Sequence, residues 1–102
     1  MSRSVHVLAT FQTLPGKERE AEALLQGLIE PTQREEGCLR YVLLRRIDRP
    51  GIFYFVEEWR STVDFRKHIA SGHLSAVMAR RDELFTVVDV AFVAPLAAAR
   101  PN

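Results

Sequence analysis

The chain has 102 residues, close to the usual size of one domain, and 47% of them are hydrophobic, as in a globular protein. Fourteen basic and thirteen acidic residues leave a net charge of +1, so no field of one sign favours nucleic acid or an anionic membrane. The longest apolar runs are far shorter than the roughly 20 residues that span a bilayer. We therefore expect a single domain over residues 1–102, with a core over about 5–95, a tail over 96–102, and neither a nucleic-acid nor a membrane partner.

The number of cysteines and the first residues of the chain indicate the cellular compartment. Cys38 is the single cysteine, which excludes an intrachain disulfide and a zinc site of the CxxC type. The first residues, MSRSVHVLATF, lack the long apolar segment and small-residue cleavage site of a secretory signal. These features predict a cytoplasmic protein.

The first half of the chain predicts a strand followed by a helix. β-Branched and aromatic residues over 5–13 favour a strand, and Leu-Pro-Gly at 14–16 ends it. The charged segment KEREAE opens a helix, because acidic side chains suit the first helical turn. Pro31 lacks a backbone donor and predicts a kink near Gly27, and Gly37 is expected to close the helix in the left-handed conformation. The buried stripe at helical spacing is Ala21, Leu24, Leu25, Leu28 and Thr32.

The second half predicts a hairpin, a broken helix and a last strand. Strands over 38–48 and 52–60 are joined by the turn Asp-Arg-Pro-Gly. Ser61 has the character of a helix N-cap, with Asp64 at the capping-box position, and the helix runs through residue 69. Ser-Gly at 71–72 interrupts it, and the last strand covers 86–95. The helical run between them carries on one side Leu74, Val77, Met78 and Leu84.

The element order is βαββαβ, which predicts an α+β, ferredoxin-like fold: a four-stranded antiparallel sheet with helices on one face. The strands, however, are apolar on both faces. In the third strand Phe53, Phe55 and Trp59 alternate with Ile52, Tyr54 and Val56, and in the last Val88, Val90 and Phe92 alternate with Val87, Ala91 and Val93. The helices can cover only one face, so we expect the other to pair with the same face of a second copy in a homodimer.

Two histidines, His68 and His73, flank the predicted helix break. On a continuous helix a separation of five residues turns their side chains roughly 140° apart, unlike the HxxxH spacing that aims two imidazoles at one metal. The break allows them to approach across a corner, but no further ligand is evident, so no metal is expected. Two interpretations remain: a general base in a pocket, or a capping and a surface histidine.

Glu57 poses a similar choice. It shares a strand face with residues expected to be buried, so its carboxyl group must be paired, hydrogen-bonded or protonated. It either forms an ion pair with Arg40 or Arg45, or it acts as an acid or base in a pocket. Tyr41 and Trp59 either line a cavity or belong to the core.

Four segments carry a resemblance to a known family. LPGKE at the end of the first strand, EEGCLRY at 35–41, FYFVEEW at 53–59 and FRKHIASGHL at 65–74 resemble the antibiotic biosynthesis monooxygenase family over about residues 5–95. The resemblance implies a dimeric α/β barrel, in which the sheets of two ferredoxin-like protomers face each other. It also implies a small oxygenase that uses O2 on a quinol or a polyketide-like aromatic phenol, with no metal or other cofactor.

The resemblance also implies roles for individual residues. The family's E-x-W strand corresponds to Glu57 and Trp59, and its H-x4-H corner to His68 and His73. His68 and Glu57 are then the catalytic candidates. The substrate-binding candidates are Trp59, His73 at the rim of the pocket, Tyr41 and Arg40. Two alternatives stay open: an isomerase of a small phosphorylated signal molecule, and a non-catalytic dimer for small-ligand binding or stress response.

Overall fold

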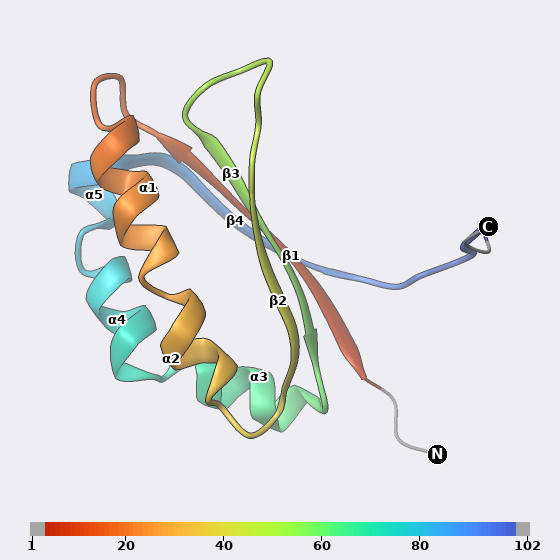
Figure 1. Cartoon of the computed structure of the whole chain (residues 1–102). Coiled ribbons are helices and arrows are strands. Elements are labelled where there is room, and N and C mark those ends of the chain that lie inside the picture. Colours follow the sequence, from red (N-terminus) through yellow and green to blue (C-terminus); the bar gives the residue numbers. More distant parts are fainter. Residues whose placement is uncertain (1–3, 100–102) are drawn as a thin grey trace.

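The computed structural model describes residues 4–99 as an antiparallel sheet with its helices packed on one face (Figure 1). The elements are β1 (Val5–Thr13), α1 (Glu18–Gln26), α2 (Ile29–Gln33), β2 (Cys38–Arg45), β3 (Ile52–Trp59), α3 (Thr62–Ile69), α4 (Gly72–Met78), α5 (Arg81–Leu84) and β4 (Phe85–Val93). The four strands lie in the order β2-β3-β1-β4. The predicted α+β, ferredoxin-like fold is confirmed.

The first helical segment is divided into α1 and α2 at Gly27 and Leu28. Pro31 cannot donate a hydrogen bond to the carbonyl of Gly27, four residues earlier, so the helix is interrupted where the sequence predicts a kink. The apolar stripe nevertheless continues past the break. Its fully buried members are Ala21, Leu25, Leu28 and Thr32.

Gly37, in the connection between α2 and β2, does not adopt the predicted left-handed conformation. Among residues 4–99, positive φ angles occur at Gly16 (85°) and Gly51 (91°), both in turns next to strands. Gly37 is required for another reason: a Cβ atom there would lie 2.2 Å from Cγ of Asp64. The close approach of α3, rather than backbone conformation, excludes a side chain at this position.

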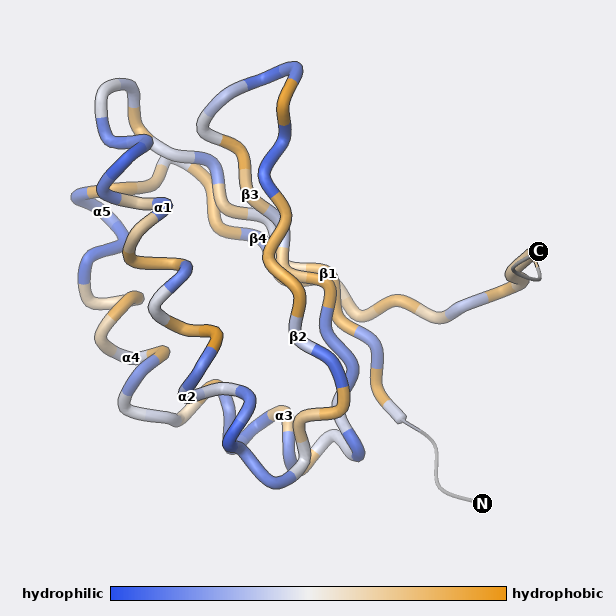
Figure 2. The backbone as a smooth tube through the Cα atoms, viewed as in Figure 1, coloured by the Kyte–Doolittle hydropathy of each residue, from blue (hydrophilic) through white to orange (hydrophobic). Residues whose placement is uncertain are grey.

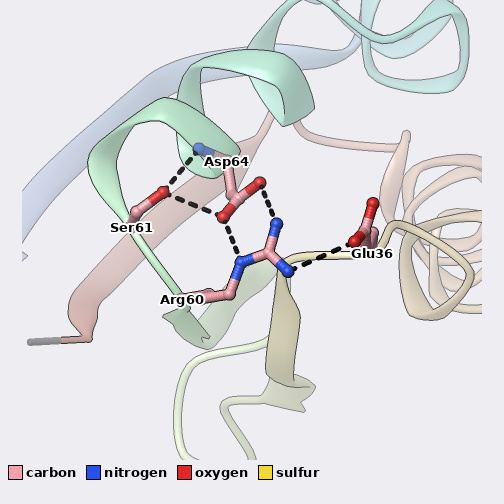
Figure 3. Close-up of polar contacts among 4 residues, drawn as sticks. All are labelled: Glu36, Arg60, Ser61 and Asp64. Carbon is pink, nitrogen blue, oxygen red and sulfur yellow. Dashed lines mark hydrogen bonds and ion pairs between the residues drawn. The ribbon is translucent and has the colours of Figure 1, made fainter. Parts of the chain in front are cut away.

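A polar network anchors the start of α3 beside Gly37 (Figure 3). Arg60 donates two hydrogen bonds to the carboxylate of Asp64, at 2.8 and 3.0 Å, and reaches Glu36 at 3.4 Å. Ser61 is the predicted N-cap, since its Oγ accepts a hydrogen bond from the backbone N–H of Asp64 at 3.1 Å. The hydrogen bonds from Arg60 hold the pKa of Asp64 below its usual range. The backbone N–H of Arg60 also donates to the carbonyl of Gly37 at 2.8 Å, which ties β3 to the α2–β2 connection.

β1 covers the predicted residues 5–13, whereas the other three strands are shorter than predicted or shifted. β2 ends at Arg45 rather than at residue 48, because the chain turns over 46–51 with Gly51 at positive φ. β3 ends one residue early, and β4 covers Phe85–Val93 instead of 86–95, because its pairing with β1 runs out at the His6–Val93 pair. The predicted hairpin between β2 and β3 is confirmed.

The predicted break at residues 71–72 is also confirmed. Ser71 caps α4, accepting a hydrogen bond from the backbone N–H of Leu74 at 3.3 Å, and its hydroxyl donates to the carbonyl of His68 at 2.6 Å. The following helical run, expected to be continuous, is divided into α4 and α5. Of its apolar side, Leu74, Val77 and Leu84 are buried and Met78 is partly buried.

The two faces of the sheet differ in their cover. All helices lie over the inner face, and among residues 4–99 no element lies over the outer face (Figure 1). The register aligns Val42, Val56, Leu8 and Ala91 in one apolar row across the outer face of all four strands. Apolar residues recur along the strands, as the hydropathy of the backbone tube shows (Figure 2).

Residues 94–99 extend away from the sheet beyond β4 without regular structure, and Leu96 is exposed (Figure 1). The predicted tail over 96–102 begins in this segment, and its last three residues lie outside the described range. Within residues 4–99 no helix has the length and apolar character needed to cross a membrane.

Replacing Gly37 tests the close approach of α3. We expect Gly37→Ala to lower the free energy of unfolding by about 1–3 kcal/mol, because the new methyl group displaces the Asp64 side chain from its partners. Gly72→Ala is the matched control, since a Cβ there meets nothing within 4 Å at the first position of α4. Urea unfolding measures both variants, and equal effects would contradict the explanation.

Candidate functional site

An apolar cavity lies between the inner face of the sheet and helices α3 and α4, with a volume of about 140 Å³. Its lining consists of Ala9, Phe11, Tyr41, Phe55, Glu57, Phe65, His68, Ile69, Leu74, Met78, Val88 and Val90. Val90, on the edge strand β4, is half exposed and marks the side on which this inner cavity approaches solvent. Three titratable groups, Tyr41, Glu57 and His68, are buried in this otherwise apolar lining.

A larger groove of about 460 Å³ lies on the surface between α1 and the β2–β3 hairpin. Its charged side chains are exposed or half-buried and partly neutralise one another, as in the 3.3 Å ion pair of Arg45 with Glu22. No titratable group lining it is fully buried. Buried groups with shifted pKa values are typical of functional sites, so we assign the candidate site to the inner cavity.

His68 projects from α3 into an aromatic environment and is only 2% exposed. Its ring centroid lies 4.5 Å from that of Trp59 and 5.4 Å from that of Tyr41. Burial lowers the pKa of His68, although its hydrogen bond to Glu35 acts in the opposite direction. The neutral imidazole is therefore favoured, which is the form that can accept a proton.

Glu35, which sequence reasoning missed, orients this imidazole. Its Oε2 lies 2.7 Å from Nδ1 of His68. Backbone hydrogen bonds to Thr32 and from Cys38, both 3.0 Å long, hold Glu35 in the α2–β2 connection. A carboxylate only accepts, so the proton of the neutral ring is on Nδ1 and Nε2 keeps its lone pair. Glu35 lies within EEGCLRY, but 33 residues separate it from His68, and no local spacing joins them.

His73 meets the same carboxylate oxygen. Its Nε2 lies 2.8 Å from Oε2 of Glu35, and its ring centroid is 6.0 Å from that of His68. The break between α3 and α4 turns the two histidines toward each other, as the Ser-Gly pair allows. His73, expected at the rim of the pocket, does not line the cavity and contacts Glu35 instead.

Glu57 lies on the inner face and is 4% exposed. The indole N–H of Trp59 donates to its Oε1 at 2.8 Å. The expected ion pair with Arg40 or Arg45 is wrong: Arg45 contacts Glu22, and Arg40 is exposed. Burial raises the pKa of Glu57 to about 7, against the opposing effect of the Trp59 hydrogen bond.

The remaining predicted site residues fall into two groups. Tyr41 lies opposite Glu57 in the sheet and lines the cavity. Its ring stacks on that of Phe55, with the ring centroids 4.6 Å apart. Burial raises the pKa of its phenol well above the usual range. Trp59 is fully buried behind the cavity, where it supports Glu57 and His68 without lining the space. Arg40 is a correction, because it pairs in register with Glu58 on the outer face and is separated from the cavity by the sheet.

The structural class of this protein is a ferredoxin-like fold with an apolar cavity, lined in part by a histidine, under its helices. Comparisons with known proteins identify its family. The model of the antibiotic biosynthesis monooxygenase family matches residues 4–80. "Putative monooxygenase Rv0793" of Mycobacterium tuberculosis is 35% identical over 97 residues, which cover 94% of this chain and 95% of that protein. The chain belongs to the antibiotic biosynthesis monooxygenase family.

Solved structures agree with this assignment. The structure of Rv0793 has a TM-score of 0.85 at 34% identity and covers 96% of this chain and 100% of its own. The crystal structure of PA3566 from Pseudomonas aeruginosa has a TM-score of 0.89 at 28% identity, with coverage of 95% and 98%. The ferredoxin-like fold of the single chain, which the family resemblance implies, is therefore confirmed.

The raised pKa of Glu57 predicts a pH dependence of stability. Between about pH 4.5 and pH 7 the folded state binds this proton more tightly than the unfolded chain, so the free energy of unfolding falls as the pH rises. The loss is on the order of 3 kcal/mol once the pH exceeds 7. His68 acts in the opposite sense, because a lowered pKa gives stability that is lost on acidification through it.

The Glu57→Gln variant isolates this contribution, since its amide oxygen can still accept from Trp59 and does not titrate. Urea unfolding from about pH 5 to about pH 8 should show the stability of the wild type falling relative to that of Glu57→Gln. Glu58→Gln, on the outer face of the same strand, is the control and should follow the wild type. Parallel curves for wild type and Glu57→Gln would contradict the prediction.

Proposed function

We propose that this protein is a cofactor-independent monooxygenase that oxidises a quinol or a polyketide-like aromatic phenol. The observation that carries the proposal is the contact between Glu35 and His68. The Glu35 carboxylate binds Nδ1 of His68, so Nε2 of the same ring is left to accept a proton. His68 lines the apolar cavity. Family membership and the naming of the Mycobacterium tuberculosis relative support an oxygenase.

The chemistry begins with transfer of a phenolic proton to Nε2 of His68. The resulting phenolate is a much stronger electron donor than the phenol, and it reduces O2 directly. A hydroquinone and one O2 give a hydroxyquinone and one water, so the substrate supplies all the electrons. One oxygen atom forms the new C–O bond, while the O–O bond breaks and the other atom leaves as water. Glu57, with a pKa of about 7, can exchange a second proton near neutral pH.

The cavity lining favours an aromatic ring over a charged ligand. A cavity of about 150 Å³ holds one benzene molecule, so the inner cavity is suited to a single ring, and a larger substrate would extend past β4. Among the described residues that line it there is no arginine or lysine, the side chains that would bind a phosphorylated signal molecule. A pocket filled by the protein's own side chains would favour a protein without catalysis. The inner cavity is not filled in this way. The isomerase and the non-catalytic dimer for small-ligand binding or stress response therefore have less support.

A homodimer through the outer face is part of the proposal. The apolar row of Val42, Val56, Leu8 and Ala91 has no cover within residues 4–99, and Leu44, Val87 and Val93 on the same face are about half exposed. Burying this row against a second copy removes it from water. The dimeric α/β barrel implied by the family has this arrangement. We expect the dimer to act in the cytoplasm, where a single, half-buried Cys38 stays reduced.

Oxygen consumption tests the activity. Protein treated with a chelator is mixed with a panel of hydroquinones, and O2 uptake is measured with an electrode. We expect turnover by the wild type and a loss of about 10²–10⁴-fold in kcat for His68→Ala, as for removal of a general base. Unchanged turnover would exclude His68 as the base, and a requirement for added flavin or iron would contradict the mechanism.

A Glu35→Gln variant tests whether Glu35 acts on the base His68 or only stabilises the structure. Glu35 raises the pKa of His68 against the effect of burial, so its neutralisation should shift the acidic limb of the rate profile to lower pH while kcat falls. A structural defect would lower the rate at every pH without this shift. An unshifted acidic limb would show that Glu35 does not act through His68.

The assembly is tested by a charge on the outer face. We expect the wild type to sediment as a dimer and Val56→Glu as a monomer, because a carboxylate in the centre of the apolar row cannot be buried without a partner. Val63→Glu on the exposed side of α3 is the matched control and should remain dimeric. A monomeric wild type, or a dimeric Val56→Glu, would refute the outer-face dimer.

A further inference from the structure

Three potential metal ligands from three separate segments converge beside the inner cavity. Oε2 of Glu35 lies 2.7 Å from Nδ1 of His68 and 2.8 Å from Nε2 of His73, and all three atoms are within 4.8 Å of one another. Glu35 comes from the α2–β2 connection, His68 from α3 and His73 from α4. The mechanism proposed above uses the first two residues and gives His73 no part.

The backbone around these ligands is held independently of the side-chain contacts. Ser71, between the histidines, donates through its hydroxyl to the carbonyl of His68 at 2.6 Å and caps α4. The carbonyl and N–H of Glu35 are both hydrogen-bonded within the connection that carries it. His68 packs against the rings of Trp59 and Tyr41. The fold therefore sets the backbone positions of the three ligands, and the Glu35 side chain completes the convergence.

Two imidazoles and one carboxylate form a donor set that zinc and related divalent ions accept in proteins. Around a tetrahedral zinc ion with bonds of 2.0–2.2 Å, the ligand atoms lie roughly 3.4 Å apart. The present separations require the ligand atoms to move by less than about 1 Å. His73 and Glu35 are 23% and 17% exposed at their side chains, which leaves them room to adjust and gives an ion and a completing water access.

We propose that Glu35, His68 and His73 bind a divalent ion of the zinc type, and that the bound ion switches off the base by exchanging the tautomer of His68. Without metal, Nδ1 carries the proton toward Glu35, and Nε2 is free to accept one from substrate. A metal ion binds the lone pair of Nδ1, so the proton of the neutral ring must be on Nε2. His68 then donates a hydrogen bond into the cavity and cannot act as a base. The binding part stands alone; the inhibitory part depends on the proposed function.

Metal binding is measured without reference to activity. Co2+ titration, followed by absorbance in the visible region and competition with Zn2+, should reveal one site per chain in the wild type. We expect His73→Ala to weaken binding by roughly tenfold or more, because loss of even an outer partner of a metal ligand has that effect. His6→Ala is the matched control: it lies on the outer face beside Glu58 and should bind as the wild type does. Circular dichroism verifies that each variant folds.

The tautomer exchange has its own spectroscopic readout. In protein labelled with ¹⁵N-histidine, the ring nitrogen shifts of His68 should identify a protonated Nδ1 in metal-free protein and a protonated Nε2 after one equivalent of Zn2+. No exchange in the presence of bound Zn2+ would overturn the switch. Equal Co2+ affinity of wild type and His73→Ala, or no binding by the wild type, would overturn the site.

Activity gives a third comparison. Zn2+ is redox-inert and does not itself oxidise a quinol. It should inhibit O2 uptake by the wild type and by His6→Ala, with recovery on addition of a chelator. Persistent activity of the wild type at saturating Zn2+ would overturn the inhibitory role. If no quinol supports O2 uptake in any condition, the proposed function fails, while the titration and the ring nitrogen shifts still decide the metal site.

Discussion

One carboxylate oxygen, Oε2 of Glu35, joins the two halves of the chain beside the cavity. It accepts from His68 in α3 and from His73 in α4, and it belongs to the connection that leads into β2. Because a carboxylate accepts hydrogen bonds and cannot donate them, this contact determines which nitrogen of His68 carries the proton. The chemical character of the inner cavity depends on that choice, since the nitrogen away from Glu35 is the one left to react.

The contact between Glu35 and His68 matters because the side chains around the His68 ring are mostly buried and apolar. His68 and Glu57 are nearly inaccessible to water and lie among aromatic rings, where a charged side chain is costly. The fold shifts both toward neutrality: burial lowers the pKa of His68 and raises that of Glu57 to about 7. A base with a lowered pKa and an acid with a pKa of about 7 can exchange protons with a substrate near neutral pH without carrying a permanent charge into an apolar space. Trp59 supports both groups from behind the cavity.

Local physical chemistry explains why much of the fold could be predicted. Pro31 breaks the first helix, Ser61 and Ser71 cap the later ones, and Gly51 turns the hairpin through conformations that depend on near neighbours in the chain. The prediction for Gly37 was wrong for the complementary reason. Glycine is required at this position because Asp64, 27 positions later, leaves no room for a side chain. A contact over that sequence distance cannot be predicted from local patterns.

The sequence by itself determined the element order, the apolar character of both sheet faces and the resemblance that names His68, Glu57 and Trp59, because periodicity and short motifs are local properties of a chain. Only the tertiary structure decided which polar groups meet. It selected Trp59 rather than an arginine as the partner of Glu57, moved Arg40 to the opposite face, and brought in Glu35 across 33 positions. Such contacts arise from packing between segments that are distant in the chain.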